Sequence, residues 1–197
     1  MVQLALDRIE DSLTPSQRRA VLGDVGSGTI EAIRGARRTE WVDASLQAEL
    51  NQAAFRHCGP EGYDQLWRSI TMSSTKDSLF AALAGGMLRI LGVSPRRLVN
   101  VIPRAANHVA RNTGVYEIVD THDPRSAMMV FRGIHPELRR DETWARASRG
   151  SLLAVTDLLK LPGSVSMDFS DLSDGVARYT LTWELPEGTP AHDDDDD

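Results

Sequence analysis

Residues 164–170 read Ser-Val-Ser-Met-Asp-Phe-Ser, and residues 176–185 read Val-Ala-Arg-Tyr-Thr-Leu-Thr-Trp-Glu-Leu. Apolar and polar residues alternate in both segments, which is the period-two pattern of a strand with one face on a core. The connector between them, Asp-Leu-Ser-Asp-Gly at 171–175, has the length and the turn-forming residues of a hairpin loop. The pattern predicts an antiparallel hairpin with one mostly apolar face.

A second hairpin is predicted upstream of the first. Residues 115–119 and 127–131 are strand-like, and the segment between them, 120–125, contains the turn formers Asp and Pro. Residues 128–131 are apolar on both faces. We therefore expect the strand that contains them to lie in the middle of a sheet.

A helix is predicted between the two hairpins. Asp141 can act as its N-cap, and Pro162 stops it. Gly150 lies in its middle, where a glycine costs about 1 kcal/mol relative to alanine, so we expect close packing at this position. The apolar stripe of this helix runs through Trp144, Ser148, Leu152, Val155 and Leu159.

The first half of the chain has helical periodicity throughout. Residues 14–17, Thr-Pro-Ser-Gln, form a capping box with proline at the first helical position. Residues 23–28 are predicted to be a loop, and Gly59-Pro60 to end one helix before another at 61–70. Further helices are expected at 6–13, 29–38, 43–58, 76–91 and 94–111, the last with a break at Pro103.

These patterns predict an α+β fold, in which an N-terminal helical half precedes a hairpin-helix-hairpin (ββαββ) unit with a four-stranded antiparallel sheet. Three regions are expected. They are an N-terminal helical segment at 1–40, a mixed α+β ligand-binding-like domain at 41–186, and a disordered acidic tail at 187–197.

Composition excludes several classes of protein. The net charge is -6, but removing the five terminal aspartates from the 28 acidic residues leaves 23 against 22 basic residues. A balanced body offers no net electrostatic footprint for nucleic acid. One cysteine, Cys58, excludes an internal disulfide framework, and no apolar run reaches the length of a membrane span. We expect a cytoplasmic protein, since the N-terminus has no secretory pattern.

The order of helices, hairpin, helix and hairpin resembles the ligand-binding fold shared by haem-nitric-oxide-binding domains, four-vinyl-reductase-type domains and transport-protein-particle subunits. Residues 41–185 also resemble an uncharacterised myxobacterial-type paralogous family. That second likeness rests on Trp41-Val42, Gly59-x-x-Gly62, Leu-Gly-Val-Ser-Pro at 91–95, the 144–160 helix and Tyr-Thr-Leu-Thr-Trp at 179–183. The resemblance implies a small apolar ligand and a homodimer that forms through helices.

The expected ligand site combines bulky apolar residues with one polar group, as small-molecule sites do. It comprises Met87, Ile102, His108, Met129, Phe131 and Trp144. The resemblance also implies haem as an alternative cofactor, with His108 as the iron ligand. The haem-binding relatives hold the propionates with tyrosine, serine and arginine at alternate strand positions, and residues 127–132 lack that pattern. No cofactor is therefore predicted.

Other chemistries lack a complete set of residues. His57 and Cys58 are adjacent, without the spacing of a zinc site or the motif of an activated nucleophile. Residues 23–29 are glycine-rich, but no strand precedes them and no lysine completes a phosphate-binding loop. Asp168, Asp171 and Asp174 stand where hairpin turns already favour aspartate. We predict no catalytic or metal-binding residues.

The sequence therefore predicts a non-enzymatic, cytoplasmic small-molecule-sensing or regulatory domain. Two alternatives remain open. One is a purely structural or protein-interaction module that dimerises through helices, and the other is a haem-dependent gas sensor.

Overall fold

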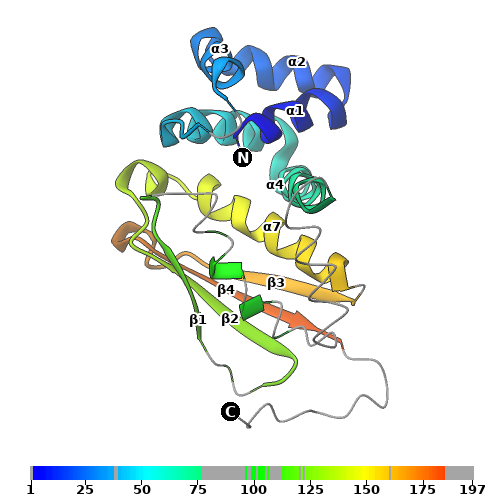
Figure 1. The fold of residues 1–197 in the computed structure, drawn as a ribbon, viewed down its shortest axis with the longest axis vertical. Coiled ribbons are helices and arrows are strands. Elements are labelled where there is room, and N and C mark those ends of the chain that lie inside the picture. The colour runs from blue at the N-terminus through cyan, green and yellow to red at the C-terminus, as the bar shows by residue number, and fades with distance from the viewer. Residues whose placement is uncertain are drawn as a thin grey trace.

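A computed structural model describes residues 2–37, 40–76, 96, 99–100, 102–104, 106, 112–119, 121, 123–159 and 161–184. Figure 1 shows a helical layer at one end of the molecule, the sheet at the other, and α7 (Thr143–Leu159) lying across the sheet between them. The helical layer comprises α1 (Val2–Ser12), α2 (Pro15–Asp24), α3 (Ser27–Gly35) and α4 (Ala44–Lys76). No helix in these described ranges is long and apolar enough to cross a membrane.

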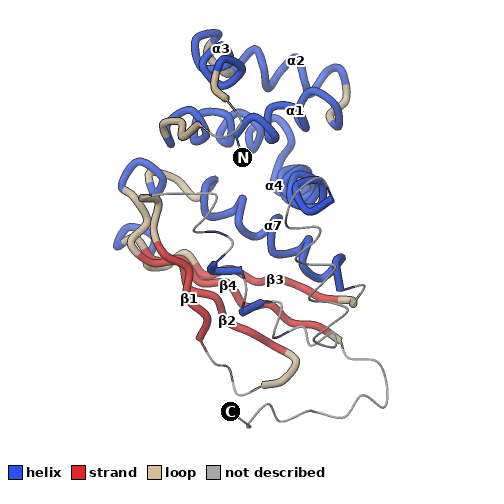
Figure 2. Tube along the Cα trace, in the orientation of Figure 1, coloured by secondary structure: helices blue, strands red, loops and turns tan. Residues whose placement is uncertain are grey.

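The four strands form one antiparallel sheet in the order β1-β2-β4-β3 (Figure 2). They are β1 (Val115–Val119), β2 (Ser126–Arg132), β3 (Gly163–Asp168) and β4 (Val176–Trp183). Both predicted hairpins are confirmed, and β2 joins them by pairing with β4. The apolar run at 128–131 lies in a central strand, as predicted.

Helix α7 is held at both ends by the residues that the sequence indicates. Asp141 Oδ1 accepts a hydrogen bond from the Thr143 N–H at 2.8 Å and so caps the first turn. The helix ends at Leu159, before Pro162. A Cβ at Gly150 would lie 2.7 Å from the Asp64 carbonyl oxygen, which confirms the close packing of α7 on α4.

The buried apolar residues form two cores. The first joins α1, α2, α3 and α4, and it includes Leu6, Ile33 and Tyr63. The second lies between α7 and the sheet and includes Phe131 and Tyr179. Because α4 and α7 pack directly against each other, the two cores are adjacent along the contact between these helices.

Two details of the helical half differ from the sequence prediction. Residues 23–28 are mostly helical, since only Val25 and Gly26 separate α2 from α3. A contact distant in sequence accompanies this: the Glu49 carboxylate of α4 accepts the Gly26 N–H at 2.7 Å and the Thr29 hydroxyl at 2.5 Å, and so fixes the N-terminus of α3. The predicted capping box at Thr14 is confirmed.

Helix α4 contains the predicted break at Gly59. The φ and ψ of Gly59 are 68° and 175°, a backbone conformation that is essentially restricted to glycine, and Pro60 follows it. Helical structure resumes at once, so α4 is two helical segments with an abrupt junction. Two short 3-10 turns are also present, η1 (Pro136–Arg139) and η2 (Leu172–Asp174).

Candidate functional site

The candidate site lies on the inner face of β1 and β2. Met129 and Phe131 alternate along β2 with their side chains toward the second core, and they are 1% and 0% exposed. Tyr116 of β1 is the register partner of Phe131, and the two rings stack with centroids 4.1 Å apart and planes 6° from parallel. The inner face at this point is therefore an apolar and aromatic surface.

Two tyrosines of the sheet form hydrogen bonds with helix α7. The Tyr116 hydroxyl lies 2.8 Å from Ser148 Oγ, and the Tyr179 hydroxyl donates to the Ala145 carbonyl oxygen at 2.8 Å. Burial raises the pKa of Tyr116 to about 12 and raises the pKa of Tyr179 well above its ordinary value. Both tyrosines stay protonated at neutral pH.

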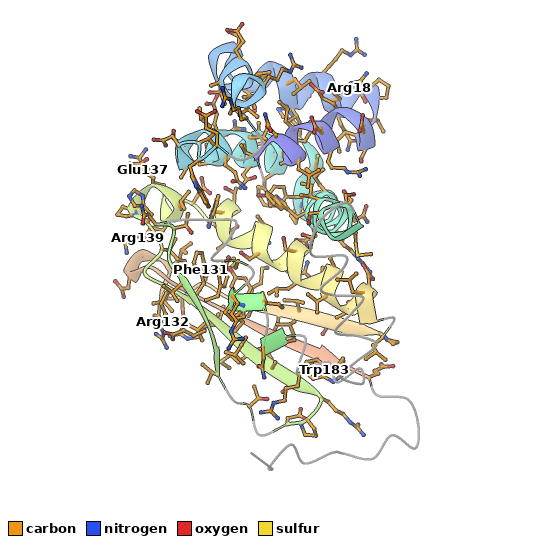
Figure 3. The ribbon with its side chains drawn as sticks, viewed as in Figure 1. Arg18, Phe131, Arg132, Glu137, Arg139 and Trp183 are labelled. Atoms are coloured by element: carbon orange, nitrogen blue, oxygen red, sulfur yellow. The ribbon has the colours of Figure 1, made fainter. Side chains whose placement is uncertain are left out.

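One buried donor at this face of α7 has no partner. Trp144 is one helical turn before Ser148, so the two side chains lie on the same face of α7. The Trp144 Nε1–H is buried and makes no hydrogen bond. The Nε1–H of Trp183 is unpaired in the same way, but Figure 3 shows Trp183 well separated from Phe131 along the sheet.

Four of the six predicted residues meet in the second core. Met129 and Phe131 are buried there, and Ile102 and Trp144 pack against the same cluster while partly buried. Met87 and His108 lie outside the described residues. The sequence prediction of this site did not include Tyr116 and Ser148. The four-residue spacing of Ser148 from Trp144 is a signal that could have identified it.

The described residues do not fit the propionates of a haem. Arg132 of β2 pairs with Glu117 at 2.8 Å and projects to the outer face of the sheet, away from α7. On α7, Arg146 Nε lies 3.0 Å from Glu142 Oε1, which is within ion-pair range although the two atoms do not make a hydrogen bond, and Arg149 pairs with Asp64. The arginines of these two elements are thus already bound to carboxylates. The hydroxyl pair of Tyr116 and Ser148 is likewise bonded within itself.

Other candidate residues have structural partners. Arg178 bridges Asp168 and Asp171, with 3.5 and 2.6 Å between the charged atoms. His57 Nε2 lies 3.0 Å from Asp24 Oδ2, and burial raises the pKa of the Cys58 thiol. Across the described residues, no group of three or more histidine, cysteine or acidic side chains could hold a metal ion.

A shallow pocket of about 350 Å³ lies elsewhere, between α1 and α3. Two of its polar side chains bond to the protein: Gln3 Nε2 donates to the Ile33 carbonyl oxygen at 3.2 Å, and Arg34 pairs with Glu10 at 2.5 Å. The pocket is lined by Gln3, Leu6, Asp7, Arg34 and Ala36. Because Gln3 and Arg34 are already paired, we do not assign it a ligand.

Solved structures share the fold. The chain is similar to the Fe(II) unliganded H-NOX protein from K. algicida, with a TM-score of 0.65 and 9% identity over 95% of this chain and 96% of that one. It is also similar to the IWP-051-bound H-NOX from Shewanella woodyi in the Fe(II)CO ligation state, with a TM-score of 0.61 and 13% identity over 96% and 97%. No family model and no curated protein matches the sequence. The chain therefore has the H-NOX fold, and at this identity the likeness concerns the fold alone.

Proposed function

We propose that this chain is a small-molecule-sensing or regulatory domain whose ligand binds on the inner face of β1 and β2, under the start of α7. The main support is that Ile102, Met129, Phe131 and Trp144 belong to the same apolar cluster, together with the buried indole N–H of Trp144, which has no partner. A buried donor without a partner costs about 1–3 kcal/mol. The unpaired N–H is explained if a bound ligand supplies the missing acceptor.

The chemistry of the cluster supports binding rather than catalysis. Its ionisable side chains among the described residues, Tyr116 and Tyr179, keep their protons at neutral pH because burial raises both pKa values. Groups of this kind orient a ligand by hydrogen bonding, whereas a general base must be poised to lose its proton near the working pH. We therefore propose a sensor without enzymatic activity.

The second candidate is a structural or protein-interaction module. The full burial of Met129 and Phe131 favours it, since both side chains are already removed from water in the free protein. In that case the inner face of the sheet is packed and takes no ligand. A homodimer formed through helices belongs to this alternative and stays a prediction.

Native mass spectrometry separates the two candidates. Protein is purified from its source without denaturation, and its mass is compared with the mass of the same sample under denaturing conditions. We expect an added mass in the native spectrum that disappears on denaturation. An identical chain mass in both spectra contradicts a retained ligand and supports the packed module.

Haem is tested separately, because the solved H-NOX structures include Fe(II) forms. Apoprotein is mixed with haemin, and absorption is recorded for the wild type and for His108→Ala. We expect equal spectra, since the described arginines near the site are already paired. A shifted Soret band in the wild type that is lost in His108→Ala would instead establish the gas-sensor alternative.

A further inference from the structure

We propose that helix α3 (Ser27–Gly35) is a conformational switch, a segment that detaches from the helical layer and docks again while the rest of the chain stays folded. Figure 1 shows α3 at the outer end of this layer, away from the sheet. The switch is independent of the proposed ligand site, because α3 belongs to the first core and that site lies in the second. Three properties of α3 support it: its sequence, its burial and the contacts at its two ends.

The sequence of α3 is poorly suited to an isolated helix. It reads Ser-Gly-Thr-Ile-Glu-Ala-Ile-Arg-Gly, in which two of the nine residues are glycine and three are β-branched. Both kinds of residue lower helix propensity, and helices of fewer than about 12 residues are marginal in water. The helical form of α3 therefore depends on its contacts with other helices.

One fully buried side chain attaches α3 to the first core. Ile33 is 0% exposed, Thr29 and Ile30 are partly buried, and the other six residues are exposed. The second half of α4 buries four large side chains in the same core: Tyr63, Leu66, Trp67 and Ile70. Because detaching α3 uncovers much less apolar surface, it should require less free energy than opening α4.

Side chains of two other helices hold the ends of α3. At the N-terminus, the Glu49 carboxylate of α4 accepts the Gly26 N–H at 2.7 Å and the Thr29 hydroxyl at 2.5 Å. At the C-terminus, Gln3 Nε2 of α1 donates to the Ile33 carbonyl oxygen at 3.2 Å. The terminal N–H and C=O groups of a helix have no partners within it, so these end contacts stabilise the docked form.

The chain is anchored on both sides of α3. Before α3, Asp24 Oδ2 accepts a hydrogen bond from Arg56 Nε at 2.9 Å, which joins α2 directly to α4. After α3, Val42 packs against the first core. The neighbouring helices therefore keep their places when α3 detaches.

Detachment uncovers an apolar surface on α1. Leu6 lines the shallow pocket between α1 and α3, and it is 2% exposed while α3 is docked. When α3 leaves, Leu6 and the side chain of Ile33 become accessible to water. The open form therefore presents apolar surface that the closed form covers.

Native-state hydrogen exchange of the full chain tests the switch. Exchange is followed by NMR, residue by residue, at urea concentrations below the unfolding transition. We expect the amides of α3 to be at least about tenfold less protected than those of residues 63–70 in α4. The protection of α3 should also fall less steeply with urea, because its opening exposes less surface than global unfolding.

Two variants distinguish detachment of α3 from unfolding of the whole chain. Gly150→Ala overpacks the contact between α7 and α4, which stays intact when α3 detaches. It should accelerate exchange at 63–70 by about tenfold and leave α3 unchanged. Glu49→Ala removes one end contact and should accelerate exchange of α3 by about tenfold. Glu61→Ala is the matched control, since it removes an exposed carboxylate from the same helix, and it should leave α3 unchanged.

Equal protection of α3 and of 63–70 in the wild type overturns the switch, and so does equal acceleration of both by Gly150→Ala. Unchanged exchange of α3 in Glu49→Ala also overturns it, because α3 is then not held by that contact. If Gly150→Ala does not fold, Asp64→Ala takes its place, since it breaks the ion pair between α4 and α7. These results do not bear on the ligand site, which native mass spectrometry tests.

Discussion

Each tyrosine of this chain bonds to α7. Tyr63 of α4 donates to the Thr143 carbonyl oxygen at 3.0 Å, Tyr179 of β4 donates to that of Ala145, and Tyr116 of β1 shares a hydrogen bond with Ser148. The sequence contains three tyrosines, so all of them are used in this way. Their hydroxyls anchor α7 to the helical half on one side and to the sheet on the other.

This arrangement predicts the alkaline behaviour of the protein. Burial is the first cause that raises the pKa of all three tyrosines, to about 12 for Tyr116 and well above the ordinary value of 10 for Tyr63 and Tyr179. A folded-state pKa above the unfolded value contributes stability below pH 10, and that stability is lost as the pH rises through the folded-state pKa.

The measurement is an ultraviolet titration of tyrosinate at constant ionic strength. We expect little tyrosinate near pH 10 in the folded protein, and its appearance together with loss of the circular dichroism signal at higher pH. Protein unfolded in urea is the control and should titrate near 10. Stepwise ionisation near pH 10 with the fold intact would contradict the buried hydroxyl positions.

Single residues show why the sequence predicts some of the site and not the rest. Met129 and Phe131 could be placed on one face of their strand because alternation is a local property, but the apolar character of both faces of 128–131 does not indicate which face is the inner one. The bond between Tyr116 and Ser148 joins residues 32 apart, so no local pattern reports it. The contact of Glu49 with the N-terminus of α3 is of the same kind, so local patterns predict a loop at 23–28, where the structure is mostly helical.

At the scale of elements, the contact between α4 and α7 depends on a glycine. A Cβ at Gly150 would lie 2.7 Å from both the Asp64 carbonyl oxygen and Trp67 Cβ. Gly150→Ala should therefore destabilise the protein by about 1–3 kcal/mol through overpacking, although alanine is the better helix former. Urea denaturation gives the change in the free energy of unfolding.

Gly23→Ala is the matched control for this substitution. Gly23 lies in α2, and nothing would be within 4 Å of its added Cβ. That variant should be stabilised by up to about 1 kcal/mol. Equal effects of the two substitutions would show that α7 and α4 are not in close contact at Gly150.

The same two helices are joined by an ion pair with little exposure. The side chains of Arg149 and Asp64 are 29% and 11% exposed, and Arg149 Nε also donates to the Val165 carbonyl oxygen of β3 at 3.0 Å. Asp64→Ala should cost about 1–3 kcal/mol, because it leaves the guanidinium poorly solvated and without its carboxylate. Thermal or urea unfolding measures this loss.

Arg34 and Glu10 provide the comparison, since their side chains are 59% and 33% exposed. Glu10→Ala should change the free energy of unfolding by less than about 1 kcal/mol, as is typical of exposed pairs. A larger loss in Glu10→Ala than in Asp64→Ala would contradict the importance of the Arg149 contact.

Sequence patterns predict individual helices and strands better than they predict which of these elements pair or pack together. Both hairpins, the α7 cap at Asp141 and the break at Gly59 follow from local signals. The placement of β4 beside β2 depends on a pairing between segments about 50 residues apart, and alternation alone does not specify it. The apolar character of both faces of 128–131 indicates only that its strand is central.

At the scale of the whole molecule, the contact between α4 and α7, which joins the two cores, predicts one unfolding transition. The first core contains Trp67 and the second contains Trp144 and Trp183, so fluorescence can report on each. In a variant with Trp41 and Trp67 replaced by phenylalanine, the fluorescence and circular dichroism midpoints in urea should coincide. The same should hold when Trp144 and Trp183 are replaced instead. Separate midpoints in either variant would show that the two cores unfold independently.

The junction at Gly59 sets where this chain tolerates a change of length. Inserting one residue into a continuous helix rotates everything beyond it by about 100°. After an insertion between Tyr63 and Ile70, the two side chains could therefore no longer both face the first core. At Gly59 the helical phase is already interrupted, and the backbone there does not transmit that rotation rigidly. Related proteins that lengthen or shorten α4 should therefore carry their insertions and deletions next to this glycine, between the two halves of the helix.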